Sequence, residues 1–146
     1  MKTIVVALLA LATFCRLQAQ EDATLEVVGG LNGALLYNTY VAIGAIADAS
    51  TENVYDSSYV VALMDEQKGL LKIAIENNKK LLASGVIKSE TDIQYLKDLN
   101  QAYQLLKTEA EALIAYMQSK SADDGNKFDE ARRQCWALIA KLLELE

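Results

Sequence analysis

Residues 89–119 read SETDIQYLKDLNQAYQLLKTEAEALIAYMQS, and this stretch decides the fold class. Apolar residues recur along it at alternating steps of three and four, which places their side chains on one face of an α-helix. Ser89, followed three residues later by Asp92, matches the capping pattern of a helix N-terminus. We therefore predict a helix over about residues 90–119 with the apolar seam Leu96, Leu99, Tyr103, Leu106, Ala110, Leu113 and Met117.

The C-terminal segment repeats this rhythm and predicts a helix over about residues 127–145. Asn126 and Asp129 have the same separation as Ser89 and Asp92, so we expect Asn126 to cap this helix. Trp136 falls just off the apolar seam, where it either covers the edge of the core or anchors a partner. The seam itself consists of Phe128, Ala131, Cys135, Leu138, Leu142 and Leu145.

A less regular seam predicts another helix over about residues 53–84. Lys79 and Lys80 suit the negative end of a helix dipole, and Gly85 suits a left-handed cap after the last turn. At the other end, we expect acids such as Asp56 to stabilise the helix, because they lie beside the positive, N-terminal end of its dipole.

The segment 27–47 contains no charged residue and lies within a predicted first helix of about residues 24–49. A helix that is apolar nearly all round is either buried in a bundle or spans a membrane. Asn32, Asn38 and Thr39 interrupt the segment, which favours burial with the three other helices wrapped around it. At ~1.5 Å per residue the segment also reaches across a bilayer, so membrane contact through it stays an alternative.

Few and short connections are expected, because the sequence contains no proline, a residue that gathers in turns and loops. Helices joined by short connections pack as antiparallel neighbours. No segment alternates with the period of two that a half-buried β-strand requires. We predict an all-α fold, a four-helix up-down-up-down bundle that forms a single domain over residues 20–146.

Residues 1–19 have the architecture of a secretory signal peptide. Lys2 supplies a basic start, residues 4–14 form an apolar run, and a more polar exit ends at the small residue Ala19. We predict cleavage after Ala19 and export of the mature chain to a periplasmic or extracellular location. Cleavage leaves Cys135 as the only thiol, which excludes an internal disulfide and leaves an intermolecular one open.

Composition excludes several classes of function. The net charge of −6 opposes binding to nucleic acid, because an acidic chain repels the phosphate backbone. The sequence has no histidine, the commonest general base and metal ligand, and it lacks phosphate-binding and nucleophile motifs. The acids between Asp123 and Asp129 do not match a calcium-binding loop, and helix capping accounts for them. We therefore predict no catalytic residues, no cofactor and no metal site.

The candidate contact residues are aromatic: Tyr37, Tyr40, Tyr55, Tyr59 and Trp136. The two tyrosine pairs lie on either side of the first predicted connection, and their spacing of three or four lets each pair share a helix face. Antiparallel packing of the two helices would bring the pairs together around a pocket. We favour packing at the edge of the core, with the hydroxyls reaching water, and the pocket is the alternative interpretation of these side chains.

Together these features predict a non-enzymatic, exported helical bundle that acts by protein–protein interaction with an unidentified partner protein. Such a module is expected to expose an apolar or aromatic patch, which can include part of the first helix. A protein that contacts membranes through segment 27–47 is one alternative. A bundle that binds a small ligand, or an enzyme that uses carboxylates, is another. No motif ties the chain to a named family.

Overall fold

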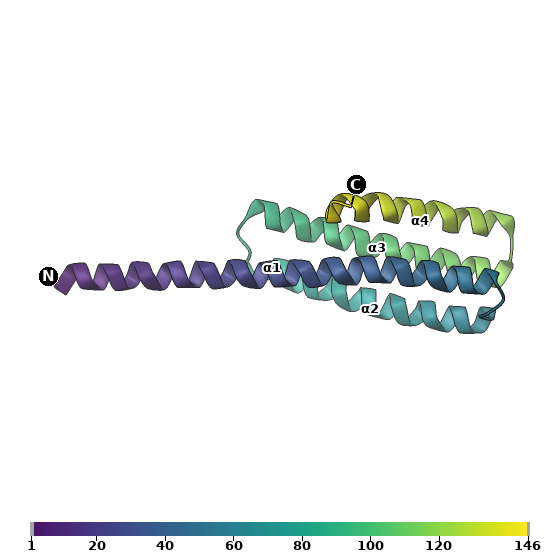
Figure 1. Cartoon of the computed structure of the whole chain (residues 1–146), viewed down its shortest axis with the longest axis horizontal. Helices are drawn as coiled ribbons and strands as arrows, with labels where there is room; N and C mark the ends of the chain where they lie inside the picture. Colours follow the sequence, from purple (N-terminus) through teal and green to yellow (C-terminus); the bar gives the residue numbers. More distant parts are fainter. Residues whose placement is uncertain (1, 146) are drawn as a thin grey trace. The chain divides into compact units, whose positions relative to one another are not determined.

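The computed structural model describes the backbone of residues 2–145 and the side chains of residues 25–145. Over this range the chain is helical without β-strands, and its helices are α1 (Lys2–Thr51), α2 (Ser57–Ala83), α3 (Glu90–Ser119) and α4 (Ala122–Leu143) (Figure 1). The predicted all-α, four-helix bundle is thereby confirmed. The predicted signal peptide, residues 1–19, lies outside the residues whose side chains are described.

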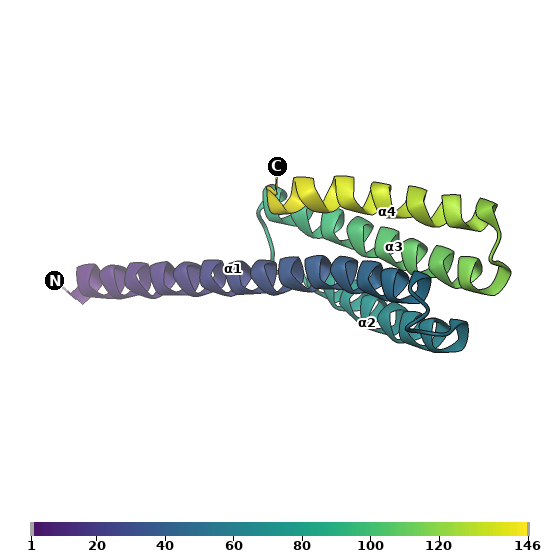
Figure 2. The same cartoon turned by 45° about the vertical axis from the view of Figure 1, so that its right-hand side comes forward.

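The chain forms two compact units, Met1–Asn32 and Gly33–Glu146. In the described part of the first unit, the Asn32 side-chain amide donates to the carbonyl oxygen of Val28 at 2.8 Å. In the second unit, α3 packs against both α2 and α4 (Figures 1 and 2). The second unit therefore contains the helical core.

The apolar seam predicted for α3 forms the centre of the core. All seven of its members are buried, and Tyr103, Leu99, Leu106 and Ala110 have no exposed surface. The Ser89 hydroxyl caps the helix as predicted, because it accepts a hydrogen bond from the backbone N–H of Asp92 at 3.3 Å. Spacing in the sequence thus predicts both the start and the buried face of this helix.

The beginning of α4 differs from the prediction. Helix α4 starts at Ala122, and its N-cap is Ser121, whose hydroxyl accepts from the backbone N–H of Asp124 at 3.2 Å. The expected cap, Asn126, lies inside the helix, so the prediction that it starts the helix was wrong. Ser121 has extended backbone angles and meets Asp124 through a second hydrogen bond at 2.9 Å, so the helix starts one turn earlier.

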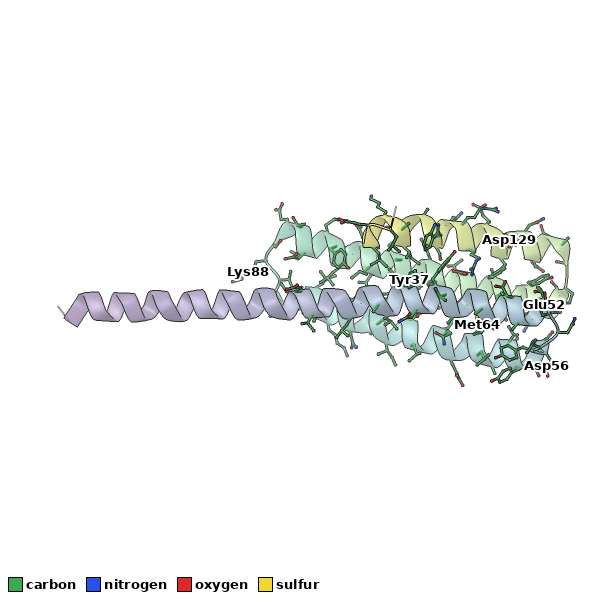
Figure 3. All side chains as sticks on the ribbon, in the orientation of Figure 1. Tyr37, Glu52, Asp56, Met64, Lys88 and Asp129 are labelled. Atoms are coloured by element: carbon green, nitrogen blue, oxygen red, sulfur yellow. The ribbon has the colours of Figure 1, made fainter. Side chains whose placement is uncertain are left out.

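The connection from α1 to α2 is a turn rather than the first turn of a helix. Asn53 has a φ of 59°, in the left-handed region, which interrupts helical geometry there. Helix α2 consequently begins at Ser57, and Asp56 caps it by accepting from the backbone N–H of Tyr59 at 2.8 Å. Figure 3 shows Glu52 and Asp56 on this connection. At the other end of α2, Gly85 adopts the predicted left-handed conformation, with a φ of 67°.

Helix α1 is not wrapped by the other helices as the sequence suggested. Within the second unit, Leu36 and Ile43 on one side of α1 have no exposed surface. The opposite side is exposed, although it is equally free of charge; its residues Ala34, Tyr37, Asn38, Val41 and Ala45 are hereafter the α1 outer face. The expectation was wrong because a helix in a four-helix bundle keeps one side toward solvent, whatever its composition.

The observed cap of α4 gives a direct test. Ser121→Ala removes the acceptor for the Asp124 backbone N–H, so it should lower the free energy of unfolding by about 1 kcal/mol. Asn126→Ala should not lower this energy, because alanine suits a helix interior better than asparagine does. Urea denaturation followed by circular dichroism measures both variants, and a larger loss for Asn126→Ala would contradict the observed cap.

Candidate functional site

A buried glutamate on α3 is the most unusual polar group in the bundle. Glu109 follows Leu106 by three residues and precedes Leu113 by four, so the helix turns its side chain toward the core. It has no exposed surface. A buried carboxylate needs a partner, because removing a charge from water without compensation is strongly unfavourable.

Arg132 of α4 supplies that partner. Its Nη1 lies 3.3 Å from Oε1 of Glu109, and about a third of the Arg132 side chain remains exposed. The second carboxylate oxygen, Oε2, accepts no hydrogen bond from an N–H or O–H group. The neighbouring Cys135 offers only its weak S–H donor. One carboxylate oxygen of Glu109 is therefore paired with a guanidinium, whereas the burial of the other is compensated only by a weak donor.

Helix α1 completes this cluster from a third direction. The Arg132 guanidinium lies over the Tyr40 ring, 4.7 Å from the ring centroid, in a cation–π arrangement. One turn along α1, Gly44 faces the same guanidinium, and a Cβ at that position would overlap both Nη atoms. Glycine at position 44 is thus what lets the guanidinium pass between α1 and α4 toward Glu109.

Burial sets the protonation behaviour of the cluster. It raises the pKa of Glu109 from the ordinary 4.5 to about 7, while Cys135 and Arg132 oppose the rise. Burial also raises the pKa of the Cys135 thiol, and the neighbouring Glu109 charge adds to that effect. Cys135 has no exposed surface, so it is a protonated core thiol without the properties of a nucleophile.

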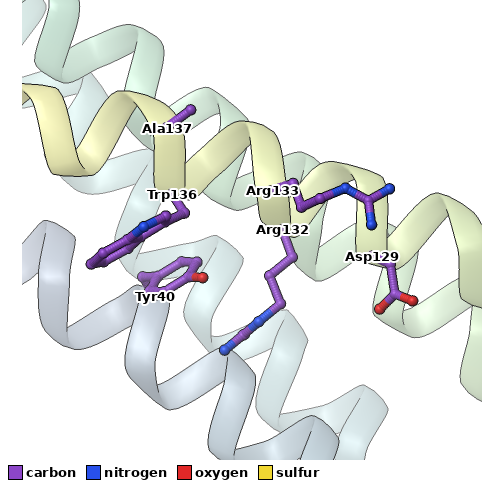
Figure 4. Close-up of a pocket in the computed structure, with 6 residues that line it drawn as sticks. All are labelled: Tyr40, Asp129, Arg132, Arg133, Trp136 and Ala137. Atoms are coloured by element: carbon purple, nitrogen blue, oxygen red, sulfur yellow. The ribbon is translucent and has the colours of Figure 1, made fainter.

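The surface beside this cluster is aromatic. The rings of Tyr40 and Trp136 stack with their centroids 5.4 Å apart. Together with Asp129, Arg132, Arg133 and Ala137 they line an open pocket of about 290 Å³ between α1 and α4 (Figure 4). Figure 4 shows the Arg132 side chain running past Tyr40 toward α1, while Arg133 extends away from it.

The predicted contact residues fall into separate places. Tyr40 and Trp136 come together at the pocket, and Tyr37 lies on the α1 outer face with 41% of its surface exposed. Tyr55 and Tyr59 pack edge-to-face at the start of α2, with centroids 5.0 Å apart, and they do not line the pocket. The structure therefore joins Trp136 to one tyrosine, and the two tyrosine pairs do not meet in this pocket.

Sequence reasoning missed Glu109 and Arg132. The available signal for Glu109 was its position in phase with the α3 seam, where an acid between Leu106 and Leu113 is out of place. No comparable signal identifies Arg132, because its importance depends on which side of α4 meets both α1 and α3.

Residues 25–145 also bear on two other kinds of site, a metal centre and a membrane span. In that range no group of three or more cysteine, aspartate and glutamate side chains is arranged to hold a metal ion. Within the same limits, no helix combines the length and the apolar character needed to cross a bilayer. Searches against protein-family models, curated proteins and solved structures found no match to the chain.

The pocket contains residue types that are common at binding surfaces. The pocket joins tyrosine, tryptophan and arginine, the three residue types that contribute most to binding energy at protein interfaces. Arg132 is held in place by Glu109 and Tyr40, and Trp136 by its stack with Tyr40. Side chains fixed in this way lose little conformational freedom when a partner binds.

The raised pKa of Glu109 predicts a pH dependence of stability. Because folding raises this pKa, the folded state holds the proton more tightly than the unfolded state. The resulting stabilisation is complete below about pH 4.5 and is lost as the pH rises through about 7. Relative to a Glu109→Gln variant, the wild-type free energy of unfolding should fall by about 2–3 kcal/mol over that window.

Urea denaturation at several pH values measures this difference. Glu111→Gln is the matched control, because it makes the same substitution on the same helix at an exposed position. Equal pH profiles for the wild type and Glu109→Gln would show that Glu109 does not titrate in the core.

Proposed function

We propose that this chain is an exported, non-enzymatic four-helix bundle that binds another protein through the α1 outer face and the adjoining Trp136 edge of α4. One observation carries the proposal: the α1 outer face is exposed yet lies in a stretch, residues 27–47, without any charged residue. Burial in the core does not account for this composition. An exposed, uncharged helix face is instead typical of a surface that meets a partner.

The residues around the α1 outer face strengthen this interpretation. Tyr37 and Val41 are separated by four residues, so their side chains are neighbours, and both are more than 40% exposed. Tyr40, three residues from Tyr37, stacks on Trp136, which is itself 39% exposed. Aromatic and aliphatic groups are thus continuous from α1 to the edge of α4. A partner helix that lies along α1 would contact them together.

The finer architecture belongs to the same proposal. The connections between consecutive helices are short: residues 52–56, residues 84–89, and the pair Lys120 and Ser121. Connections of this length favour helices that alternate in direction, so we infer an up-down-up-down order. In such an order α1 and α4 are neighbours, in keeping with the contact between Tyr40 and Trp136.

Export makes a separate prediction. Cleavage of a signal peptide after Ala19 should release a chain that begins at Gln20. Intact-mass measurement of the protein recovered from outside the cytoplasm should give the mass of residues 20–146. Replacing Ala19 with arginine, which signal peptidase does not accept at this position, should block the processing. Recovery of the chain inside the cytoplasm with residues 1–19 intact would refute export.

Site-specific photo-crosslinking tests the proposed surface. A photoreactive phenylalanine in place of Tyr37 should form adducts with a discrete protein in the cells that produce the chain. The matched control is the same replacement of Tyr59, which is exposed to a similar extent but lies on α2. Val41→Glu should abolish the Tyr37 adducts by placing an unpaired charge in the contact.

Mass spectrometry of the adducts decides between the alternatives. Discrete protein adducts at Tyr37 that are absent at Tyr59 and lost with Val41→Glu support the interaction module. Adducts with lipid at Tyr37 would instead favour membrane contact through the apolar helix. Equal labelling from both positions would show that the α1 outer face is not a binding surface.

A further inference from the structure

Helix α1 carries two seams on opposite sides. The inner seam, whose buried residues follow one another at steps of three or four, packs into the bundle and consists of Leu36, Thr39, Ile43, Ala47 and Ser50. Ala34, Asn38, Val41 and Ala45 follow one another at steps of four, three and four on the outer face, and all are exposed. This is the heptad spacing by which two helices pack along each other. A helix that packs only against the other helices of its own bundle needs one such seam, on the side that faces the core.

Self-association imposes a strict condition on charge. In a symmetric dimer the same patch lies on both sides of the contact. Acidic side chains in such a patch would therefore lie close to the same acidic side chains of the second copy and repel them. The outward sides of the other helices carry exposed acids, among them Asp65, Glu66 and Glu76 on α2, Glu111 on α3, and Asp129 and Glu130 on α4. In a chain with a net charge of −6, the α1 outer face avoids this repulsion.

The polar residue of the outer seam is also suited to pairing with itself. Asn38 lies between Ala34 and Val41, and its side-chain amide has both donor and acceptor groups. Two such amides can therefore hydrogen-bond across a two-fold axis. A single asparagine in an otherwise apolar seam is a known means of fixing the register and number of paired helices. The small side chains of Ala34 and Ala45 let the two backbones approach closely.

We propose that the α1 outer face binds the same face of a second copy of this chain, so that two bundles pair through their α1 helices. This inference rests on the proposed function and names the partner at that surface. The seam from Ala34 to Ala45 is about 17 Å long, which is short for a permanent interface. The dimer should therefore be reversible, with a dissociation constant between about 10 µM and 1 mM.

Analytical ultracentrifugation of the full chain across that concentration range, under reducing conditions, measures the association. The average mass of the wild type should rise from that of one chain at the lowest concentration toward that of two chains at the highest. Val41→Glu should weaken the dimer at least about tenfold, because a charge buried without a partner opposes pairing. Ile73→Glu is the matched control, since Ile73 is also an exposed aliphatic residue but lies on α2, and it should leave the dimer unchanged.

Chemical cross-linking provides a second test that does not require a charged variant to remain folded. Asn38→Cys should be joined to a second copy by a short bismaleimide, whereas Asn77→Cys, at an exposed asparagine of α2, should not. Both variants carry Cys15→Ser, and the remaining native cysteine, Cys135, is buried and should not interfere. A wild type that keeps the mass of one chain, or equal behaviour within either pair of variants, would overturn the inference. Tyr37 adducts that contain a different protein would then leave the proposed function standing without the second copy.

Discussion

Apolar burial along α3 holds the bundle together, because this helix packs against both α2 and α4. Its seam runs from Leu96 to Met117 without an exposed member, and each large apolar side chain buried in this way contributes roughly 1.5–3 kcal/mol. Residues 25–145 contain a single cysteine, the buried Cys135, so within that range the helices are held together by non-covalent contacts. Helices α2 and α4 each pack against α3.

The same packing explains why one polar cluster is tolerated. Glu109 lies in phase with the seam, and its charge is balanced by a guanidinium that reaches it from α4 past a glycine of α1. The contact joins three helices through a single buried carboxylate. Buried pairs of this kind seldom add much net stability, but they disfavour arrangements that leave the charge alone. The cluster thus restricts how α1 and α4 can dock, which in turn places Tyr40 beside Trp136.

Local patterns in the sequence were sufficient for much of the fold. The α3 seam, the Ser89 cap and the left-handed Gly85 all depend on residues close together in the chain, and all three were predicted. The start of α4 was missed because Ser121 and Asn126 both have a suitable acid three residues later, and spacing alone does not rank them.

The candidate site was harder to predict from the sequence than the fold, because its contacts join residues that are far apart in the chain. Arg132 and Glu109 are 23 residues apart on different helices, and only packing brings them together. Two of the five predicted aromatic residues, Tyr40 and Trp136, meet in the pocket, and no sequence pattern linked them. The exposure of α1 was missed for another reason: composition reports how apolar a helix is but not how many neighbours it has.

The stack between Tyr40 and Trp136 gives the molecule an optical property. Trp136 is the only tryptophan in the sequence, so its fluorescence arises from a single place, at the boundary between α1 and α4. A tyrosine ring and a guanidinium border it there, and both are attached to or held against α1. Any separation of α1 from α4 would expose the indole to water and shift its emission to longer wavelengths. The chain consequently carries its own spectroscopic reporter of whether its first helix is docked.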